Sequence, residues 1–127
     1  MKNIKKLLIL GFQSANMMLI IFYLYPGSIF GYFLYGDSSI QPQLTRDFIV
    51  SSNHVYAFIV LSFLGVVAYQ KTPNIDFAII YLFLLSIILE LFHIIIPTRE
   101  FEWADLFGNI AGVLFIIIIY KVINKYV

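Results

Sequence analysis

Four apolar segments, each about as long as a membrane is thick, constrain the fold of this chain more than any other feature. They cover residues 7–25, 49–69, 77–96 and 106–120, and none contains more than one acidic or basic side chain. A helix needs about 20 apolar residues to cross a hydrocarbon core of roughly 30 Å. The segments therefore predict an all-α integral membrane protein, a four-helix bundle that forms one domain over residues 1–127.

The composition points the same way and excludes several classes of function. The 127 residues are 61% hydrophobic and 12% charged, which leaves too little polar surface for a water-soluble protein of this size. Without cysteine the chain has no disulfide and no thiolate metal site, and no cofactor is expected. The net charge of +1 gives no electrostatic reason to expect nucleic acid as a partner.

The distribution of lysine and arginine predicts the orientation of the bundle in the membrane, because cytoplasmic segments carry an excess of these residues. With the N-terminus inside, six lysines fall on the cytoplasmic side and only Arg46 and Arg99 face out. The first apolar segment follows lysines as a signal peptide would, but it is too long for one and is interpreted as a retained span. We therefore expect both termini in the cytoplasm and the protein in the bacterial inner (plasma) membrane.

The connections between the spans are predicted from aromatic residues, proline and polar caps. The loop at residues 27–47 contains IFGYFLYG, whose aromatic rings favour the headgroup level and predict an interfacial turn. The short connection at residues 70–74 makes the second and third helices antiparallel neighbours. Pro97 ends the third helix, and Asp105 is predicted to cap the fourth. Tyrosines near helix ends are interpreted as interface anchors.

Gly108 and Gly112 form a GxxxG pair, which lets another backbone approach closely in lipid. We assign these glycines and Pro97 to helix packing. Whether the chain forms a homo-oligomer is left open. Transport is disfavoured because four helices give no duplicated halves and only one clearly intramembrane acid, although a dimer would change that argument.

A polar cluster is predicted at the outer end of the bundle, from His54, Glu90, His93, Asp105 and Asn109. Glu90 and His93 are three residues apart and Asp105 and Asn109 four apart, so each pair shares a helix face. Glu90 lies on the order of 9 Å inside the apolar zone. A charged side chain at the centre of a membrane helix costs about 2.5–3.5 kcal/mol, so Glu90 should have partners. We expect these partners to be Arg99 and His54.

These residue types suit proton transfer and anion binding. Acid-base catalysis is assigned to Glu90, His93 and His54, since a carboxyl beside an imidazole can exchange a proton. Substrate binding is assigned to Arg99, Asp105 and Asn109, because arginine grips phosphate or carboxylate with two N–H groups. No metal site is assigned, since the acid and histidine of ExxH supply only two ligands. For each residue a purely structural role stays open: a buried tie between helices, a helix cap or an interhelical hydrogen bond.

At these positions the chain resembles the VanZ-like family of small bacterial membrane proteins. That family carries an acid, then a glutamine or histidine three residues later, followed by proline, arginine, aspartate, asparagine and glycine. The matching residues are Glu90, His93, Pro97, Arg99, Asp105, Asn109 and Gly112. An upstream histidine matches His54, and a later leucine-glycine matches Leu64 and Gly65, so the resemblance covers about residues 50–115.

The chain also departs from the family pattern. Many members have an Asp-Lys pair before the histidine and a tyrosine after it, where Val50, Ser51 and Phe58 stand here. Leu89 occupies a position where a second acid is frequent. Roles that rest on that lysine or on paired carboxylates are therefore not expected. The family is similar to a protein linked with low-level resistance to the glycopeptide teicoplanin, and the resemblance implies no settled biochemical activity.

The leading hypothesis is an outward-facing polar pocket that binds or processes an anionic cell-envelope lipid or lipid-linked intermediate. Membrane lipids and a lipid-linked envelope precursor are the expected partners. The alternative is a non-enzymatic accessory or packing protein that acts through a partner. The first predicts that Glu90→Gln abolishes turnover, and the second that Gly108→Leu is as damaging as any polar change.

Overall fold

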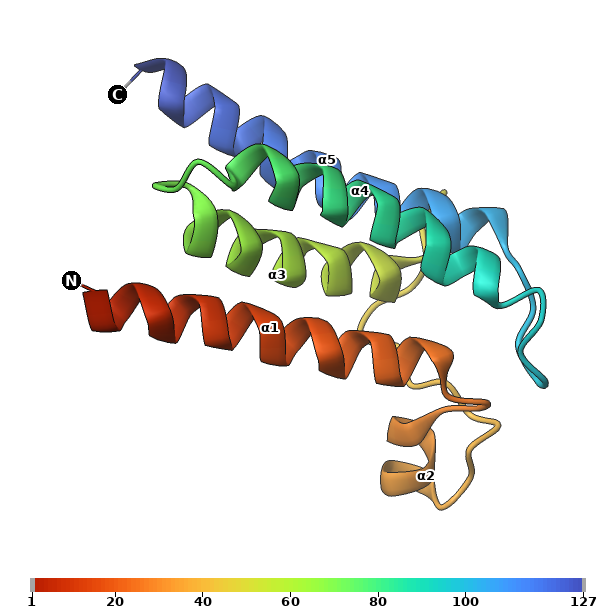
Figure 1. Cartoon of the computed structure of the whole chain (residues 1–127). Coiled ribbons are helices and arrows are strands. Elements are labelled where there is room, and N and C mark those ends of the chain that lie inside the picture. Colours follow the sequence, from red (N-terminus) through yellow and green to blue (C-terminus); the bar gives the residue numbers. More distant parts are fainter. Residues whose placement is uncertain (1, 127) are drawn as a thin grey trace.

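The computed structural model describes residues 2–126, and every regular element in that range is a helix. The elements are α1 (Lys2–Leu24), α2 (Ile29–Tyr35), α3 (Ser52–Tyr69), α4 (Ile75–Phe92) and α5 (Trp103–Tyr126) (Figure 1). All except the short α2 are long and apolar enough to cross a membrane. The predicted all-α fold with four spans is confirmed. The start of α1 and the end of α5 lie at the same end of the bundle (Figure 1).

The helix ends differ from the ends of the apolar segments. Helix α1 already begins at Lys2 and α5 continues to Tyr126, because lysine favours helix and polar side chains at a helix end reach water. Helix α5 also begins earlier than predicted, at Trp103, which places Asp105 inside its first turn. The prediction that Asp105 caps this helix is therefore wrong, and its carboxylate has another partner.

The predicted interfacial turn is a short helix, α2, that lies beside the far end of α1 (Figure 1). Ser28 caps its start by accepting a hydrogen bond from the Gly31 backbone N–H at 2.9 Å. Gly36 ends it in the left-handed conformation, with φ 69°, which glycine adopts without a Cβ clash. The aromatic side chains of α2 are mostly exposed, as expected at a membrane interface.

Close backbone contact holds α5 against α3. A Cβ on Gly112 would lie 2.5 Å from the Val55 carbonyl oxygen, and one on Gly108 would lie 2.8 Å from the Ser51 carbonyl oxygen. Any side chain at these two positions would push the helices apart. The GxxxG pair thus faces a helix of the same chain. Helix α5 also packs against α4, whereas α1 packs mainly against α3.

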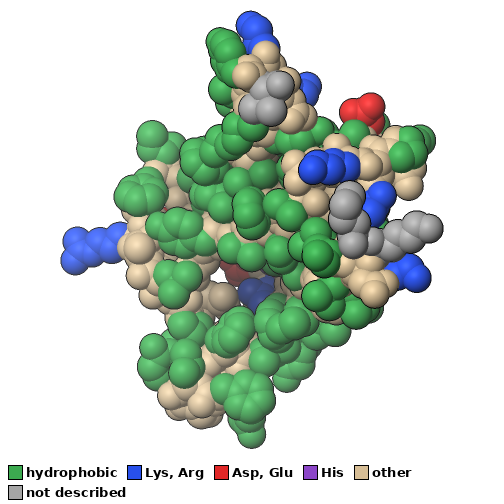
Figure 2. All heavy atoms as spheres, turned by 90° about the vertical axis from the view of Figure 1, so that its left-hand side faces the viewer, with side chains coloured by type: hydrophobic (Ala, Val, Ile, Leu, Met, Phe, Trp, Pro, Cys, Tyr) green, Lys and Arg blue, Asp and Glu red, His purple; other side chains and the backbone are tan. Residues whose placement is uncertain are grey.

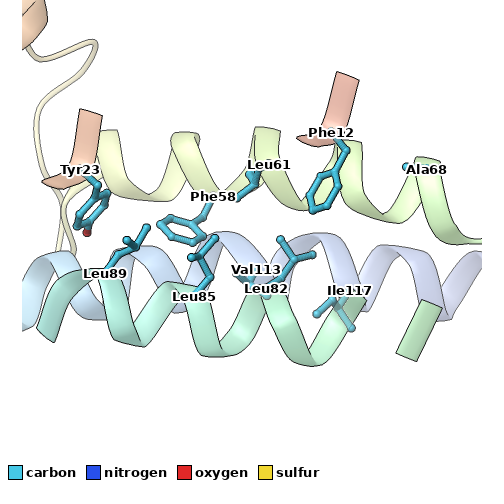
Figure 3. Packing of buried hydrophobic residues seen from close by; sticks show 10 residues of the cluster. All are labelled: Phe12, Tyr23, Phe58, Leu61, Ala68, Leu82, Leu85, Leu89, Val113 and Ile117. Carbon is cyan, nitrogen blue, oxygen red and sulfur yellow. The ribbon is translucent and has the colours of Figure 1, made fainter. Parts of the chain in front are cut away.

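The buried hydrophobic core runs along the axis of the bundle and receives side chains from all four long helices (Figure 3). Tyr23 stands at one end of this row. Beyond Tyr23 is the end of the bundle that carries residues 27–51 and 93–102, which we call the loop end. The core members are Phe12, Tyr23, Phe58, Leu61, Ala68, Leu82, Leu85, Leu89, Val113 and Ile117.

Hydrogen bonds fasten the long loop over the start of α3. The Asp47 carboxylate accepts a bond from the Ser52 backbone N–H at 2.8 Å, which satisfies one of the free donors of the helix. The Asn53 side chain donates to the Pro42 carbonyl at 2.7 Å and accepts from the Leu44 N–H at 3.1 Å. The loop therefore forms a fixed wall next to the polar residues of the loop end.

Candidate functional site

Glu90 is fully enclosed, with none of its surface exposed, and its carboxyl group contacts three polar groups. The Tyr23 hydroxyl donates to Oε2 at 2.7 Å, and the Glu102 backbone N–H donates to Oε1 at 3.0 Å. The His93 Nδ1 atom lies 3.4 Å from Oε1. Arg99 and His54, the expected partners, make no ion pair or hydrogen bond with Glu90 among the described residues. That expectation is wrong, because the Arg99 guanidinium binds backbone carbonyls and His54 contacts Tyr23, Asn109 and Asp105 instead.

Tyr23 is the centre of the polar cluster and was not singled out from the sequence. Its hydroxyl oxygen lies 2.6 Å from His54 Nδ1 and 2.6 Å from Asn109 Nδ2, in addition to its bond to Glu90. One side chain thus links α1, α3, α4 and α5. Tyr23 is only 8% exposed, so its interpretation as an interface anchor is wrong.

A periodic signal in α1 points to this buried face. Asn16 and Tyr23 are seven residues apart, which places them on the same side of a helix, and Phe12 lies one turn before Asn16. All three are buried. Asn16 donates to the Tyr81 hydroxyl at 2.6 Å, which makes a second polar contact between α1 and α4. Polar residues repeated at this spacing in an apolar helix indicate a polar partner inside the bundle.

The hydrogen-bond pattern places the protons around Tyr23. The Asn109 amide nitrogen donates to the Ser86 carbonyl at 3.0 Å, which fixes which way the amide points. Its oxygen then faces His54 Nδ1 at 3.0 Å. Because an amide oxygen only accepts, His54 Nδ1 carries a proton. The Tyr23 hydroxyl can therefore donate its single proton to Glu90 while it accepts from Asn109 and His54.

His54 also contacts Asp105. The other ring nitrogen, Nε2, lies 3.2 Å from the Asp105 carboxylate. Since Nδ1 is already a donor, this contact is favourable only if a proton lies between Nε2 and the carboxylate. The side chains of His54 and Asp105 are 18% and 17% exposed, so both groups are within reach of a molecule at the site.

His93 supports Tyr23 from the other side. Its Nε2 atom donates to the Tyr23 backbone carbonyl at 2.9 Å, and its ring stacks on the Tyr23 ring with the centroids 4.7 Å apart. Its Nδ1 atom points toward Glu90. Both nitrogens of His93 are thus engaged inside the cluster, which suits a residue that fixes the positions of Tyr23 and Glu90.

Arg99 forms hydrogen bonds with backbone carbonyls at the end of α1. Its guanidinium donates to the carbonyl oxygen of Phe22 at 3.3 Å, which the end of the helix leaves without a partner. It also donates to the carbonyl oxygens of Tyr25 at 3.2 Å and Gly27 at 2.6 Å, just beyond the helix. The preceding Thr98 has φ 65°, a strained turn that directs the chain back toward α1. Burial lowers the pKa of Arg99 below its ordinary value, while the nearby Asp105 and Glu90 carboxylates oppose that shift. The guanidinium stays charged at neutral pH.

Two cavities meet at the loop end. A polar cavity of about 380 Å³ lies between the long loop and the turn after α4, and Asp105, Glu100, Glu102 and Asp47 contribute to its wall. An apolar cavity of about 620 Å³ lies between α1, α2 and α3. Glu90 lines neither cavity and lies behind the wall. Both cavities are lined by Gln41, Asn53, His54, His93 and Arg99.

His54, Glu90 and Asp105 also have the composition of a metal site. One ligand atom from each lies within 4.8 Å of the other two. Carboxylate and imidazole ligands of this kind suit Zn²⁺. In the present arrangement Tyr23 bonds to two of these residues, so a bound ion would have to displace those hydrogen bonds.

The fold and the site define a small multi-pass helical protein whose apolar spans are tied together by a buried ionisable cluster. The family model for VanZ/LLP1 matches residues 11–124, and the chain belongs to that family. The matched region includes most of α1 and therefore Tyr23, which lies outside residues 50–115. No curated protein and no solved structure matches the chain.

Proposed function

We propose that this VanZ-like protein binds or processes an anionic cell-envelope lipid, or a lipid-linked intermediate, at the polar cavity of the loop end. In this proposal it lies in the bacterial plasma membrane with both termini in the cytoplasm, because its lysines gather at the opposite end of the bundle. The cavity then faces outward. A role in glycopeptide (teicoplanin) resistance is the physiological setting that the family resemblance suggests.

The observation that carries the proposal is the unpaired charge of Arg99. The guanidinium is partly buried and lines both cavities, yet no carboxylate lies within 4.0 Å of its nitrogens in residues 2–126. Its contacts are neutral carbonyl oxygens. A half-buried cation without an ion partner favours an anion beside it, and arginine suits the oxygens of phosphate or carboxylate.

The polar cluster supplies a proton beside this anion site. His54 and Asp105 line the cavity and lie 3.2 Å apart, so they are the groups that would exchange a proton with a bound headgroup. The position of Tyr23 is fixed by Glu90, His93 and Asn109, and Tyr23 in turn fixes the ring of His54. In this assignment Glu90 is a positioning residue.

Arg99→Gln is expected to weaken binding of hexadecyl phosphate at least about tenfold, because it removes the only guanidinium at the cavity. Binding is measured by native mass spectrometry of the purified protein in a non-ionic detergent. Arg46→Gln is the matched control, since Arg46 is an exposed arginine of the long loop that lines neither cavity. Arg46→Gln should bind as the unaltered protein does.

Arg99→Lys separates loss of charge from damage to the fold, because it keeps the cation but not the planar fork that contacts three carbonyls. We expect Arg99→Lys to bind hexadecyl phosphate more tightly than Arg99→Gln does, even if both variants unfold at a lower temperature than the unaltered protein. Equal binding by the unaltered protein and Arg99→Gln would reject the anion site and favour an accessory protein that acts through a partner.

A further inference from the structure

The apolar cavity is a second feature of the site. Binding of an anion at Arg99 does not explain why such a cavity is present. Helix α1 contributes Met18, Leu19 and Phe22 to its wall. Helix α3 contributes Ala57 and Val60 from the opposite side. Figure 2 shows a hollow among hydrophobic side chains, with acidic and basic side chains visible deep inside it. Of the charged side chains, Arg99 lines the apolar cavity, whereas acidic ones line the polar cavity. A hydrophobic cleft therefore leads from the level of the spans to Arg99.

The third wall of the cavity is α2, which is fixed by the loop that follows it. A Cβ on Gly31 would clash with the carbonyl oxygen of Ile40, so helix and loop pack backbone to backbone. The Ser28 backbone N–H also donates to the Ser38 carbonyl at 2.7 Å. This packing holds Ile29, Phe30 and Leu34 at the cavity. Helix α2 therefore forms a wall of the apolar cavity, and backbone contacts fix its position.

We infer that the apolar cavity holds one hydrocarbon chain of the ligand while its phosphate lies at Arg99. This inference rests on the proposed function and narrows the ligand to a phosphate-bearing lipid that reaches the site sideways from the membrane. Arg99, His54 and His93 line both cavities, so a headgroup beside them is continuous with a chain between α1 and α3.

The size and polarity of the two cavities match the two parts of such a ligand. Pockets of roughly 300–1,000 Å³ hold drug-sized molecules, so a cavity of about 620 Å³ suits one chain rather than a whole two-chain lipid. Five polar residues of its wall also line the polar cavity: Gln41, Asn53, His54, His93 and Arg99. A soluble anion would contact only these shared residues and would leave the apolar walls in contact with water or lipid.

The inference is tested by filling the apolar cavity without touching the anion contact. Val60 lines the cavity and is 58% exposed, so tryptophan fits there without disturbing the core. Ile118 on α5 has the same exposure and lines neither cavity, which makes Ile118→Trp the matched control. Val60→Trp should bind hexadecyl phosphate at least about tenfold more weakly, and Ile118→Trp should bind it normally.

A chain series gives the second arm of the test. Hexadecyl phosphate should bind the unaltered protein more than about a hundredfold more tightly than methyl phosphate, which presents the same anion without the chain. Methyl phosphate and inorganic phosphate should compete for the site only weakly. Val60→Trp should abolish most of the gain from the long chain and leave the binding of methyl phosphate unchanged.

The outcomes separate this inference from the proposed function. If Arg99→Gln weakens binding but Val60→Trp does not, the anion site stands and the chain lies elsewhere. If methyl phosphate binds as tightly as hexadecyl phosphate, the ligand is a soluble anion and the chain site is rejected. If Arg99→Gln has no effect on either compound, the proposed function itself fails.

Discussion

Replacing Gly112 with valine is expected to lower the free energy of unfolding of the bundle by about 3 kcal/mol or more. A Cβ at this position would lie 2.5 Å from the Val55 carbonyl oxygen, 2.9 Å from Phe58 Cβ and 3.0 Å from the Ile59 backbone nitrogen. None of these atoms belongs to a flexible side-chain end. The clash is relieved only if α3 and α5 separate, and that contact brings His54 to Asp105 and Asn109.

Gly11→Val is the matched control for this substitution. Gly11 lies in α1, where a Cβ would meet nothing within 4 Å, so valine there should change stability by less than about 1 kcal/mol. Both variants are compared by their unfolding midpoints in the same detergent. A Gly112→Val protein as stable as the unaltered chain would show that α3 and α5 do not pack through this glycine.

Tyr23→Phe is expected to cost about 2–4 kcal/mol, although it removes a single oxygen atom. The lost hydroxyl donates to Glu90 and accepts from His54 and Asn109, so three polar groups each lose one hydrogen bond together. The loss is largest for Glu90, because its carboxyl group is fully enclosed and water cannot replace the missing donor. Tyr32→Phe, at a tyrosine that is 62% exposed, should be neutral within about 0.5 kcal/mol.

The same variant has a spectroscopic signature. The Tyr23 hydroxyl fixes the ring of His54 and one of its proton positions, so the ¹⁵N resonances of that ring should change in Tyr23→Phe. They should stay the same in Tyr32→Phe. Unchanged His54 resonances together with unchanged stability would remove Tyr23 from the centre of the cluster.

The number and type of the helices could be predicted from the sequence because the lipid environment leaves few alternatives. Long apolar runs must satisfy their own backbone hydrogen bonds, and a helix does so within one segment. The small residues at positions 108 and 112 also indicated close packing, although the sequence did not say against which helix. The ends of the helices were less predictable, because polar residues extend a helix into water at little cost.

The membership of the polar cluster was only partly predictable. The sequence indicated that Glu90, His93, His54, Asp105 and Asn109 lie at one end of the bundle, and the structure brings them together. The sequence did not indicate Tyr23, because tyrosine is common at membrane interfaces. Composition alone does not distinguish a tyrosine that is buried in the bundle from one at the interface. Only its spacing from Asn16 distinguishes it.

The partners of Arg99 show a second limit of sequence reasoning. A charged side chain was expected to find an opposite charge, so Arg99 was expected to pair with Glu90. The structure satisfies Arg99 with three backbone carbonyls and Glu90 with a hydroxyl, a backbone N–H and an imidazole. Backbone groups at a helix end are strong acceptors, but every residue has them, so they leave no pattern in the sequence.

The most direct measurement is a structure of the purified protein with an alkyl phosphate that carries bromine at the end of its chain. The bromine and the phosphorus mark the two ends of the ligand independently. The account predicts the phosphate within hydrogen-bond distance of the Arg99 guanidinium and the bromine in the apolar cavity between α1 and α3. A phosphate bound away from Arg99, for example beside Lys121 or Lys125 at the opposite end of α5, would contradict it.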